Sequence, residues 1–386
     1  LDPADVHVVA PDVGGGFGPK IGMYAEYYVL GALARLAGRP VRWVERRTEN
    51  MLAMGHGRAQ AQTIEIGGTR DGRVLAYRLT GIQDAGAYPM VGAYLPSFTA
   101  MMAPGVYDIA RVVTDLRSVV TTTAPTVAYR GAGRPEATEA IERGMDLFAA
   151  EIGMDPVDVR RRNLIPPFDE PYTTAVGSTY DVGDFEGALD RVLEAAGYDE
   201  LRAEQARRRA DGAVVQLGIG VSIYVEITAG PRAGQQEFAE IVMDERGEVT
   251  VFTGSSAHGQ GHATSFSMLV SDALGVPMDD ITVVHGDTDA VEKGVGTYAS
   301  RSLQVGGTAV LRTADALVVR ARELAADRLE ADPADIVLDQ GAGVLHVAGS
   351  RSVSVGWTDV VVEAGGSLGE TLSHRTTAPT FPFGAH

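Results

Sequence analysis

A short glycine-rich run between two arginines constrains this chain more than any other part of its sequence. Residues 127–136 read Val-Ala-Tyr-Arg-Gly-Ala-Gly-Arg-Pro-Glu. The pattern predicts an extended segment, a tight turn and a helix that begins at Pro135, because the first helical position does not need the N–H that proline lacks. The free N–H groups at this helix start, together with Arg130 and Arg134, favour an anionic ligand.

Two other glycine-rich loops also have the features of an anion-binding site. Residues 14–18 read Gly-Gly-Gly-Phe-Gly, and residues 258–262 read His-Gly-Gln-Gly-His. Glycine lets the backbone approach a ligand closely because it has no Cβ atom. We expect Phe17 to form a wall of a pocket, and Gln260 can offer a heterocycle both a donor and an acceptor. The first loop lacks the spacing of the dinucleotide fingerprint, and the alternative for it is an isolated tight turn.

A further loop combines hydroxyl and charged side chains. We number the loops at residues 14–18 and 258–262 first and second, and this one third. It reads His-Gly-Asp-Thr-Asp over residues 285–289 and Gly-Thr-Tyr-Ala-Ser-Arg-Ser over residues 296–302. Hydroxyls, N–H groups and a guanidinium at a helix start suit a phosphate or a nucleobase. A different hypothesis is a metal-dependent hydrolase, which would need convergence of His258, His262, Asp287 and Asp289. The remaining interpretation is that these side chains only bond within their own loops.

Apolar periodicity divides the chain into strands and helices. A buried strand is predicted at 6–10, and a helix at 20–37 is ended by Gly38 and Pro40. After a charge-rich connector the pattern begins again, with strands at 215–227 and 280–285, a hairpin at 244–247, and helices at 262–274 and 302–330. We therefore predict an α+β fold with domains over residues 1–165 and 215–386 and a connector over residues 166–214.

Charge and cysteine content exclude several classes of function. The 386-residue chain has a net charge of -18, which disfavours nucleic acid and anionic membranes as partners. It has no cysteine, so it holds no zinc–thiolate or iron–sulfur centre of its own. No run reaches the roughly 20 apolar residues that a membrane-spanning helix needs, so we expect no membrane insertion. Leu1 and His386 both look like cut ends, and we expect a fragment of something longer.

Together, these motifs resemble the large, molybdenum-binding subunit of the xanthine dehydrogenase, aldehyde oxidase and aerobic carbon monoxide dehydrogenase family. The resemblance covers essentially the whole chain, which corresponds to only about half of such a subunit. The segments that carry it are residues 14–18, 128–134, 258–262, 285–289 and 296–302. It implies two elongated mixed α/β domains that grip a molybdopterin cofactor between them, here truncated at both ends.

The resemblance also implies which residues bind the cofactor, molybdopterin cytosine dinucleotide with molybdenum. Phe17, Arg130 and Gly131 would form the wall of the metal pocket, and no side chain would ligate the metal directly. Gln260 and Gly261 would bond the pterin, and Ser300 and Arg301 would hold the dinucleotide. The full implied set is Gly16, Phe17, Gly18, Tyr129, Arg130, Gly131, Ala132, His258, Gly259, Gln260, Gly261, Thr297, Ser300 and Arg301. No catalytic residue is expected within the chain, because the family's glutamate would lie beyond its C-terminal end, and the fragment alone would be inactive.

Two departures from the family pattern narrow the expected chemistry. Gly131 stands where carbon monoxide dehydrogenases of the established kind carry a cysteine that tethers copper, so we expect a site without copper. The Ala-Tyr-Arg-Gly-Ala-Gly-Arg form resembles a second, less understood group of carbon monoxide dehydrogenase-like proteins. Ile21 follows Lys20, where xanthine dehydrogenases have an acidic residue, and this argues against a purine substrate.

The implied activity is hydroxylation of an aldehyde or an N-heterocycle with oxygen from water. Electrons would pass to iron–sulfur clusters and then to FAD on partner subunits, in a cytoplasmic dimer of heterotrimers. Two alternatives stay open: a copper-free enzyme like carbon monoxide dehydrogenase, and a catalytically incomplete cofactor-binding fragment.

Overall fold

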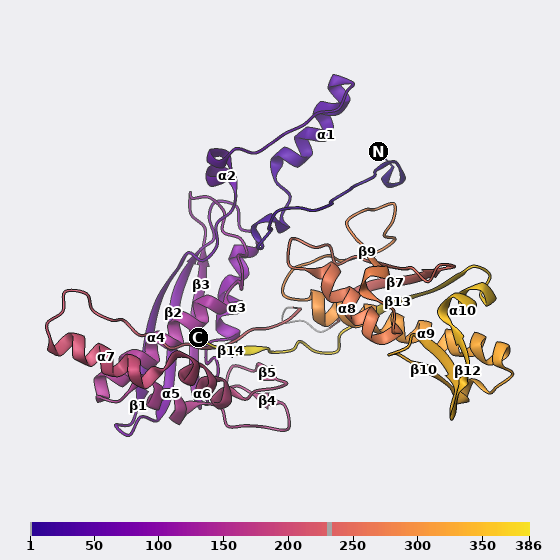
Figure 1. The fold of residues 1–386 in the computed structure, drawn as a ribbon. Helices are drawn as coiled ribbons and strands as arrows, with labels where there is room; N and C mark the ends of the chain where they lie inside the picture. Colours follow the sequence, from indigo (N-terminus) through magenta and orange to yellow (C-terminus); the bar gives the residue numbers. More distant parts are fainter. Residues whose placement is uncertain (1, 230–233) are drawn as a thin grey trace. The chain divides into compact units, whose positions relative to one another are not determined.

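A computed structural model describes residues 2–229 and 234–386, and the chain divides into two compact units (Figure 1). Unit 1 consists of Leu1–Gly15 and Ile227–Pro379, and unit 2 consists of Gly16–Glu226 and Thr380–His386. The fold is a mixture of helices and strands, as predicted. Within the described ranges, no helix is both long enough and apolar enough to cross a membrane.

Unit 2 is built on a three-stranded sheet of β1 (Gln60–Gly68), β2 (Val74–Asp84) and β3 (Arg111–Val119). β1 and β2 pair antiparallel through a tight turn, whereas β2 and β3 pair parallel. The parallel pairing requires a crossover, which η3 (Val91–Tyr94) and α3 (Leu95–Met101) provide. α4 (Arg134–Ile152) packs on β1, where Gly144 lies against Ile64 and Ile66 (Figure 1).

The helix predicted from Pro135 is confirmed, and α4 begins one residue earlier, at Arg134. Gly133 caps it with a φ of 91°, and the Glu136 carboxylate accepts a hydrogen bond from the Gly133 N–H. The other elements of unit 2 are η2 (Pro19–Ile21), α1 (Ala25–Ala37), α2 (Arg47–Ala53), α5 (Pro156–Asn163), β4 (Tyr172–Thr173), β5 (Thr179–Tyr180), α6 (Phe185–Ala196), α7 (Tyr198–Ala210), β6 (Ile223–Val225) and β14 (Phe383–Ala385).

Unit 1 contains a four-stranded sheet and a three-stranded sheet. The first has the order β13 (Ser367–Arg375), β7 (Gln236–Asp244), β8 (Val249–Thr253) and β9 (Ile281–Val284). α9 (Thr308–Leu329) packs on β7 and β13, and its buried face includes Val310, Leu317 and Ala321. The remaining elements are η1 (Pro3–Asp5), α8 (His262–Leu274), η4 (Met278–Asp280), the π-helix η5 (Ser302–Gly307), η6 (Pro333–Asp335), β10 (Ile336–Asp339), β11 (Val344–Val347), β12 (Ser350–Gly356) and α10 (Trp357–Glu363).

The structure differs from the local predictions in three segments. Residues 6–10 form no strand; Val8 and Val9 are 53% and 54% exposed, and only an isolated bridge joins Val9 to Asp287. The helix predicted from residue 20 begins at Ala25, because Gly22 and Tyr24 are extended. The strand predicted over residues 215–227 is only β6. The division into domains 1–165 and 215–386 stays a prediction.

Candidate functional site

In unit 2, residues 16–18 of the first glycine loop lie directly against residues 128–134, which we call the arginine–glycine loop. The Arg130 N–H donates a hydrogen bond to the Phe17 carbonyl oxygen at 2.9 Å. Gly18 has a φ of 100°, and a Cβ atom there would lie 2.6 Å from the Ala128 carbonyl oxygen. Any larger residue would therefore push the two loops apart. The structure thus brings together two motifs that the sequence separates by more than a hundred residues.

Arg58 holds the arginine–glycine loop from a third segment. Its Nη1 donates to the Tyr129 carbonyl oxygen at 2.9 Å, and its Nη2 donates to the Arg130 carbonyl oxygen at 2.8 Å. The guanidinium carbon also lies 5.3 Å from the centroid of the Tyr129 ring. Sequence reasoning missed Arg58, and its only local signal is the Gly-His-Gly run that precedes it at residues 55–57.

The two arginines of the loop have different partners. Arg134 Nε donates to the Glu226 carboxylate at 2.6 Å, and its Nη1 donates to the Ala132 carbonyl oxygen at 2.9 Å. Among the residues that the structure describes, the Arg130 guanidinium has no carboxylate partner. Its carbon lies 5.7 Å from the centroid of the Phe17 ring, and that ring is 56% exposed. Arg130 is therefore the cation of this loop that is free to bind an anion.

Gly131 adopts a backbone conformation that L-residues rarely use. Its φ is 93°, and a Cβ atom at this position would lie 3.0 Å from two ring atoms of Pro135. The turn between Arg130 and the start of α4 therefore favours glycine for both conformational and steric reasons. A cysteine here would be strained unless the turn changed its shape.

The second glycine loop belongs to unit 1 and leads into α8. Gly259 and Gly261 have φ values of 94° and 82°, and apart from the adjacent backbone no atom of the described residues lies within 4 Å of where their Cβ atoms would be. The positive φ values of these two positions therefore favour glycine, and the space next to their Cα atoms is open. Gln260 is exposed, and its side-chain oxygen accepts a hydrogen bond from the His258 N–H.

His262 plays a structural role at the start of α8. It is 6% exposed, its Nδ1 lies 2.9 Å from the Ser255 carbonyl oxygen, and its ring stacks on Phe266. Burial lowers the pKa of His262 below its ordinary range. A neutral, buried imidazole that bonds its own loop is not available to a ligand.

The third loop, also in unit 1, has two residues in the left-handed region, Ala299 and Ser300, with φ values of 50° and 54°. Ser300 is exposed, and the Thr297 hydroxyl lies 3.2 Å from Ser302 Oγ. Arg301 is fully buried and bonds Glu237 and two backbone carbonyls of the same unit. Its predicted contact with the dinucleotide stays a prediction.

The hypothesis of a hydrolytic metal site is wrong for the part of the chain that the structure covers. No group of three or more histidine, aspartate or glutamate side chains in that part is arranged to hold a metal ion. His262 is turned into its own loop, while Asp287 Oδ1 pairs instead with His7 Nε2 at 2.8 Å. The four residues named in the hypothesis do not converge.

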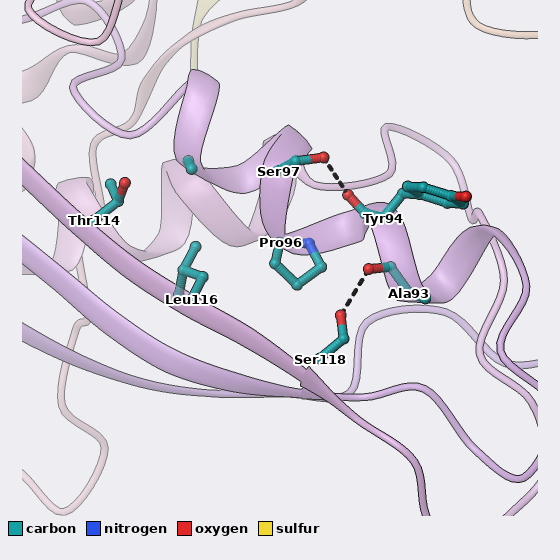
Figure 2. A pocket seen from close by; sticks show the side chains of 8 residues that line it. Ala93, Tyr94, Pro96, Ser97, Thr114, Leu116 and Ser118 are labelled. Carbon is teal, nitrogen blue, oxygen red and sulfur yellow. Dashed lines mark hydrogen bonds between the residues drawn. The ribbon is translucent and has the colours of Figure 1, made fainter.

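A hollow of about 430 Å³ in unit 2 lies between α3 and β3 (Figure 2). Its lining includes Pro96, Leu116 and Ser118, and Ser118 Oγ donates a hydrogen bond to the Ala93 carbonyl oxygen. None of the predicted site residues lines it. It also contains no charged group, and we do not assign it to the functional site.

Comparison with known proteins identifies the family. Two family models, each described as a molybdopterin cofactor-binding domain, match residues 1–164 and 191–386. This chain belongs to the family of molybdopterin-binding large subunits that includes those of xanthine dehydrogenase and carbon monoxide dehydrogenase. The carbon monoxide dehydrogenase large chain of Hydrogenophaga pseudoflava is 35% identical to it over 402 residues, which cover 99% of this chain and 50% of that protein.

Solved structures of the family share the fold. Quinoline 2-oxidoreductase from Pseudomonas putida 86 is 32% identical and superposes with a TM-score of 0.90 over 98% of this chain and 50% of its own. A Cu,Mo-CO dehydrogenase is 31% identical, with a TM-score of 0.90 over 99% of this chain and 51% of its own. The large-subunit fold expected from the motifs is thereby confirmed. The chain spans about half the length of the relatives it matches.

The side chains present suit the phosphate-bearing cofactor that a molybdopterin-binding subunit requires. The unpaired guanidinium of Arg130 and the exposed amide of Gln260 are donors without a committed charged partner in the described residues. Glycine conformations leave open space at Gly259 and Gly261. Guanidinium and amide donors beside open backbone are what phosphate and pterin groups bind.

Proposed function

We propose that this large subunit binds molybdopterin as the cytosine dinucleotide, with molybdenum, through its glycine loops. The observation that carries the proposal is the Arg130 guanidinium, which has no carboxylate partner among the described residues and lies over the exposed ring of Phe17. Two other segments hold the backbone of this arginine in place, through Phe17 and Arg58. A cation fixed in this way binds an anion without a large cost of ordering.

The residues predicted for cofactor binding take part in this proposal in two groups. Phe17, Arg130 and Gly131 form the pocket wall in unit 2, with Gly16, Gly18, Tyr129 and Ala132 shaping the turn. In unit 1 the pterin and dinucleotide groups would bind to His258, Gly259, Gln260, Gly261, Thr297, Ser300 and Arg301. For Arg301 we infer an indirect contribution, because its side chain is buried.

We further propose that the intact enzyme hydroxylates an aldehyde or an N-heterocycle. When bound, the cofactor supplies a two-electron oxidation with oxygen from water. The protein's part is to hold the anionic groups with Arg130 and to keep water from one side of the pocket with Phe17. The similarity to quinoline 2-oxidoreductase, an enzyme named for an N-heterocycle, supports an N-heterocycle as one substrate class.

Electrons would leave through iron–sulfur and FAD partner subunits, because this chain has no cysteine to hold a cluster. We propose a cytoplasmic dimer of such heterotrimers. A copper-free carbon monoxide dehydrogenase is the second candidate, supported by 35% identity to a carbon monoxide dehydrogenase large chain. A catalytically incomplete cofactor-binding fragment is the third.

The test is the cofactor content of the intact complex. The whole gene product and its partner subunits are produced in a host supplied with molybdenum, and molybdenum and pterin are quantified. We expect about one molybdenum per large subunit, since one pocket accepts one cofactor. Persistent absence of both from the intact complex would overturn the proposal. A panel of aldehydes and N-heterocycles, assayed by dye reduction, then separates the substrate classes.

A further inference from the structure

A buried carboxylate at the start of β7 bonds two of the candidate cofactor loops at once. Glu237 is 1% exposed, and both of its oxygens accept hydrogen bonds. Oε1 accepts from the Val295 N–H at 3.2 Å and from the Phe238 N–H at 3.0 Å. Oε2 accepts from Ser255 Oγ at 3.1 Å and from Arg301 Nη1 at 2.6 Å.

One of the four donors, the Phe238 N–H, follows Glu237 directly on β7, and the other three come from the loop segments. Ser255 lies between β8 and the second glycine loop, Val295 lies between the two parts of the third loop, and Arg301 lies in its second part. The two loops also touch through their backbones, because a Cβ atom on Gly254 would overlap the Cα atom of Gly294. The carboxylate of Glu237 therefore lies where the two loops come closest.

Arg301 extends the same network along the third loop. Its side chain and that of Glu237 are both 0% exposed. Nη1 also donates to the Gly296 carbonyl oxygen at 2.6 Å, and Nη2 donates to the Gln236 carbonyl oxygen. The guanidinium carbon lies 5.3 Å from the centroid of the Tyr298 ring. Two residues of the loop from residue 296 to residue 301 thus contact the guanidinium at its end.

We propose that Glu237 is a positioning residue that fixes the second and third loops in one mutual arrangement, with Arg301 as its buried counterion. The proposal rests on the proposed function insofar as these loops bind molybdopterin. Arg301 acts through the loop, and the groups presented to the cofactor are the exposed Gln260 and Ser300.

A charge is needed here because all four groups that face Glu237 are donors. A carboxylate can accept from every one of them, whereas a glutamine amide would turn an NH₂ group toward a donor. Removing one partner of a buried ion pair also leaves the other charge uncompensated. The loops would then lose the contact that holds them together.

The rival explanation is that the pair only adds general stability. Unit 2 offers a matched control, because Glu142 is also a buried carboxylate that bonds an arginine. It accepts from Arg160 Nε at 2.8 Å and from the Tyr107 hydroxyl at 2.6 Å. This carboxylate contacts none of the candidate loops.

The experiment compares Glu237→Gln with Glu142→Gln in the full chain by residue-resolved amide hydrogen exchange, without cofactor. We expect the Ser255, Val295 and Arg301 amides to exchange at least about tenfold faster in Glu237→Gln, because hydrogen bonds to charged groups are strong when buried. In Glu142→Gln these three amides should keep their wild-type rates. Equal exchange at these amides in the wild type and Glu237→Gln would overturn the proposal.

If Glu237→Gln does not fold, Ser255→Ala and Arg301→Lys carry the test. Ser255→Ala removes one of the four donors and should accelerate exchange at Ser255 and its neighbours. Arg301→Lys keeps the charge but not the planar fork, so it should retain the wild-type protection of the Val295 amide while leaving the loop from residue 296 to residue 301 more open. Unchanged exchange in both variants would contradict the positioning role.

Molybdenum and pterin content of the intact complex is the second readout, and it separates the two proposals. If the wild type carries cofactor, Glu237→Gln should lose most of it, while Glu142→Gln retains it. If the wild type carries none but the exchange result holds, the proposed function fails and the positioning role stands. Full cofactor loading in Glu237→Gln together with opened loops would overturn the link to cofactor binding.

Discussion

Arg58 Nη2 lies 2.8 Å from the carbonyl oxygen of Arg130, so one arginine holds the backbone of another. Nη1 of the same guanidinium donates a hydrogen bond to the Tyr129 carbonyl oxygen at 2.9 Å. Arg58 itself has a φ of 69°, an unusual conformation for a residue other than glycine. The loop that presents Arg130 is therefore held by long-range contacts and not by its own sequence alone.

The first prediction concerns Arg58→Lys. A lysine has no planar fork and cannot donate to both carbonyl oxygens. The free energy of opening the loop should therefore fall by roughly 1–2 kcal/mol, a value kept low because the site is partly exposed to solvent. Exchange of the Arg130 and Ala132 amides should rise. Arg78→Lys, at an exposed ion pair with Glu65, is the control and should leave both amides unchanged.

The second prediction concerns Arg130→Ala in the intact complex. The loss of a charge-assisted hydrogen bond to an anion should weaken cofactor retention by about 1.5–3 kcal/mol and abolish turnover. Arg130→Lys should not restore activity, because a single ammonium lacks the fork. Arg117→Ala on β3, where the arginine pairs with Asp115, is the control. Normal molybdenum content and rate in Arg130→Ala would mean that the residue is only structural.

The third prediction tests the turn at Gly131. Gly131→Ala should cost about 1–2 kcal/mol in the free energy of unfolding, because its φ of 93° disfavours a Cβ atom. Urea unfolding measures the change. Gly31→Ala is the matched control: it lies inside α1 with open space around it, and it should be neutral or stabilising by up to about 1 kcal/mol. Equal stability of wild type and Gly131→Ala would show that the turn adapts.

The fourth prediction concerns copper and carbon monoxide. The family resemblance aligns Gly131 with a copper-tethering cysteine, and this chain has no cysteine, so we infer that it offers no thiolate to hold Cu(I) beside molybdenum. We expect molybdenum without copper and little oxidation of carbon monoxide by the purified complex. Carbon monoxide-dependent dye reduction, with copper quantified alongside, measures both. Robust turnover would contradict the prediction, and Gly131→Cys would then be the informative variant, although the turn strains any side chain at that position.

The fifth prediction concerns the tether between His7 and Asp287 in unit 1. The hydrogen bond to Asp287 raises the pKa of His7 above its ordinary value of 6.5, and the same bond lowers the pKa of Asp287 below 3.8. The His7 contribution to stability is thus complete below pH 6.5 and is lost as pH rises through the raised pKa. The Asp287 contribution is present above pH 3.8 and is lost as pH falls through the lowered pKa.

Titration of His7 by NMR measures this shift. Asp287→Asn should return the pKa of His7 toward 6.5. Asp289→Asn should have a smaller effect, since Asp289 Oδ2 lies 3.5 Å from His7 Nδ1, whereas Asp287 Oδ1 lies 2.8 Å from His7 Nε2. An unshifted His7 in the wild type would show that the tether does not form in solution.

The sequence by itself determined the features that depend on a few neighbouring residues. The helix start after Gly133, the helix from His262 and the hairpin at Gly247 all follow from local signals: glycine in the left-handed region, a proline in the first turn, and periodic apolar side chains. The three glycine loops, and with them the family, could be identified for the same reason, because their motifs are contiguous.

Only the tertiary structure decided what each charged side chain does. Arg130, Arg134 and Arg301 look alike in the sequence, yet Arg134 pairs with Glu226, Arg301 is buried on Glu237, and Arg130 has no carboxylate among the described residues. Arg58 and Glu237 could not be identified from a contiguous motif, because the residues they bond are 71 and 64 positions away in the sequence. Contacts over such separations depend on how strands and loops pack, and local pattern carries no information about that.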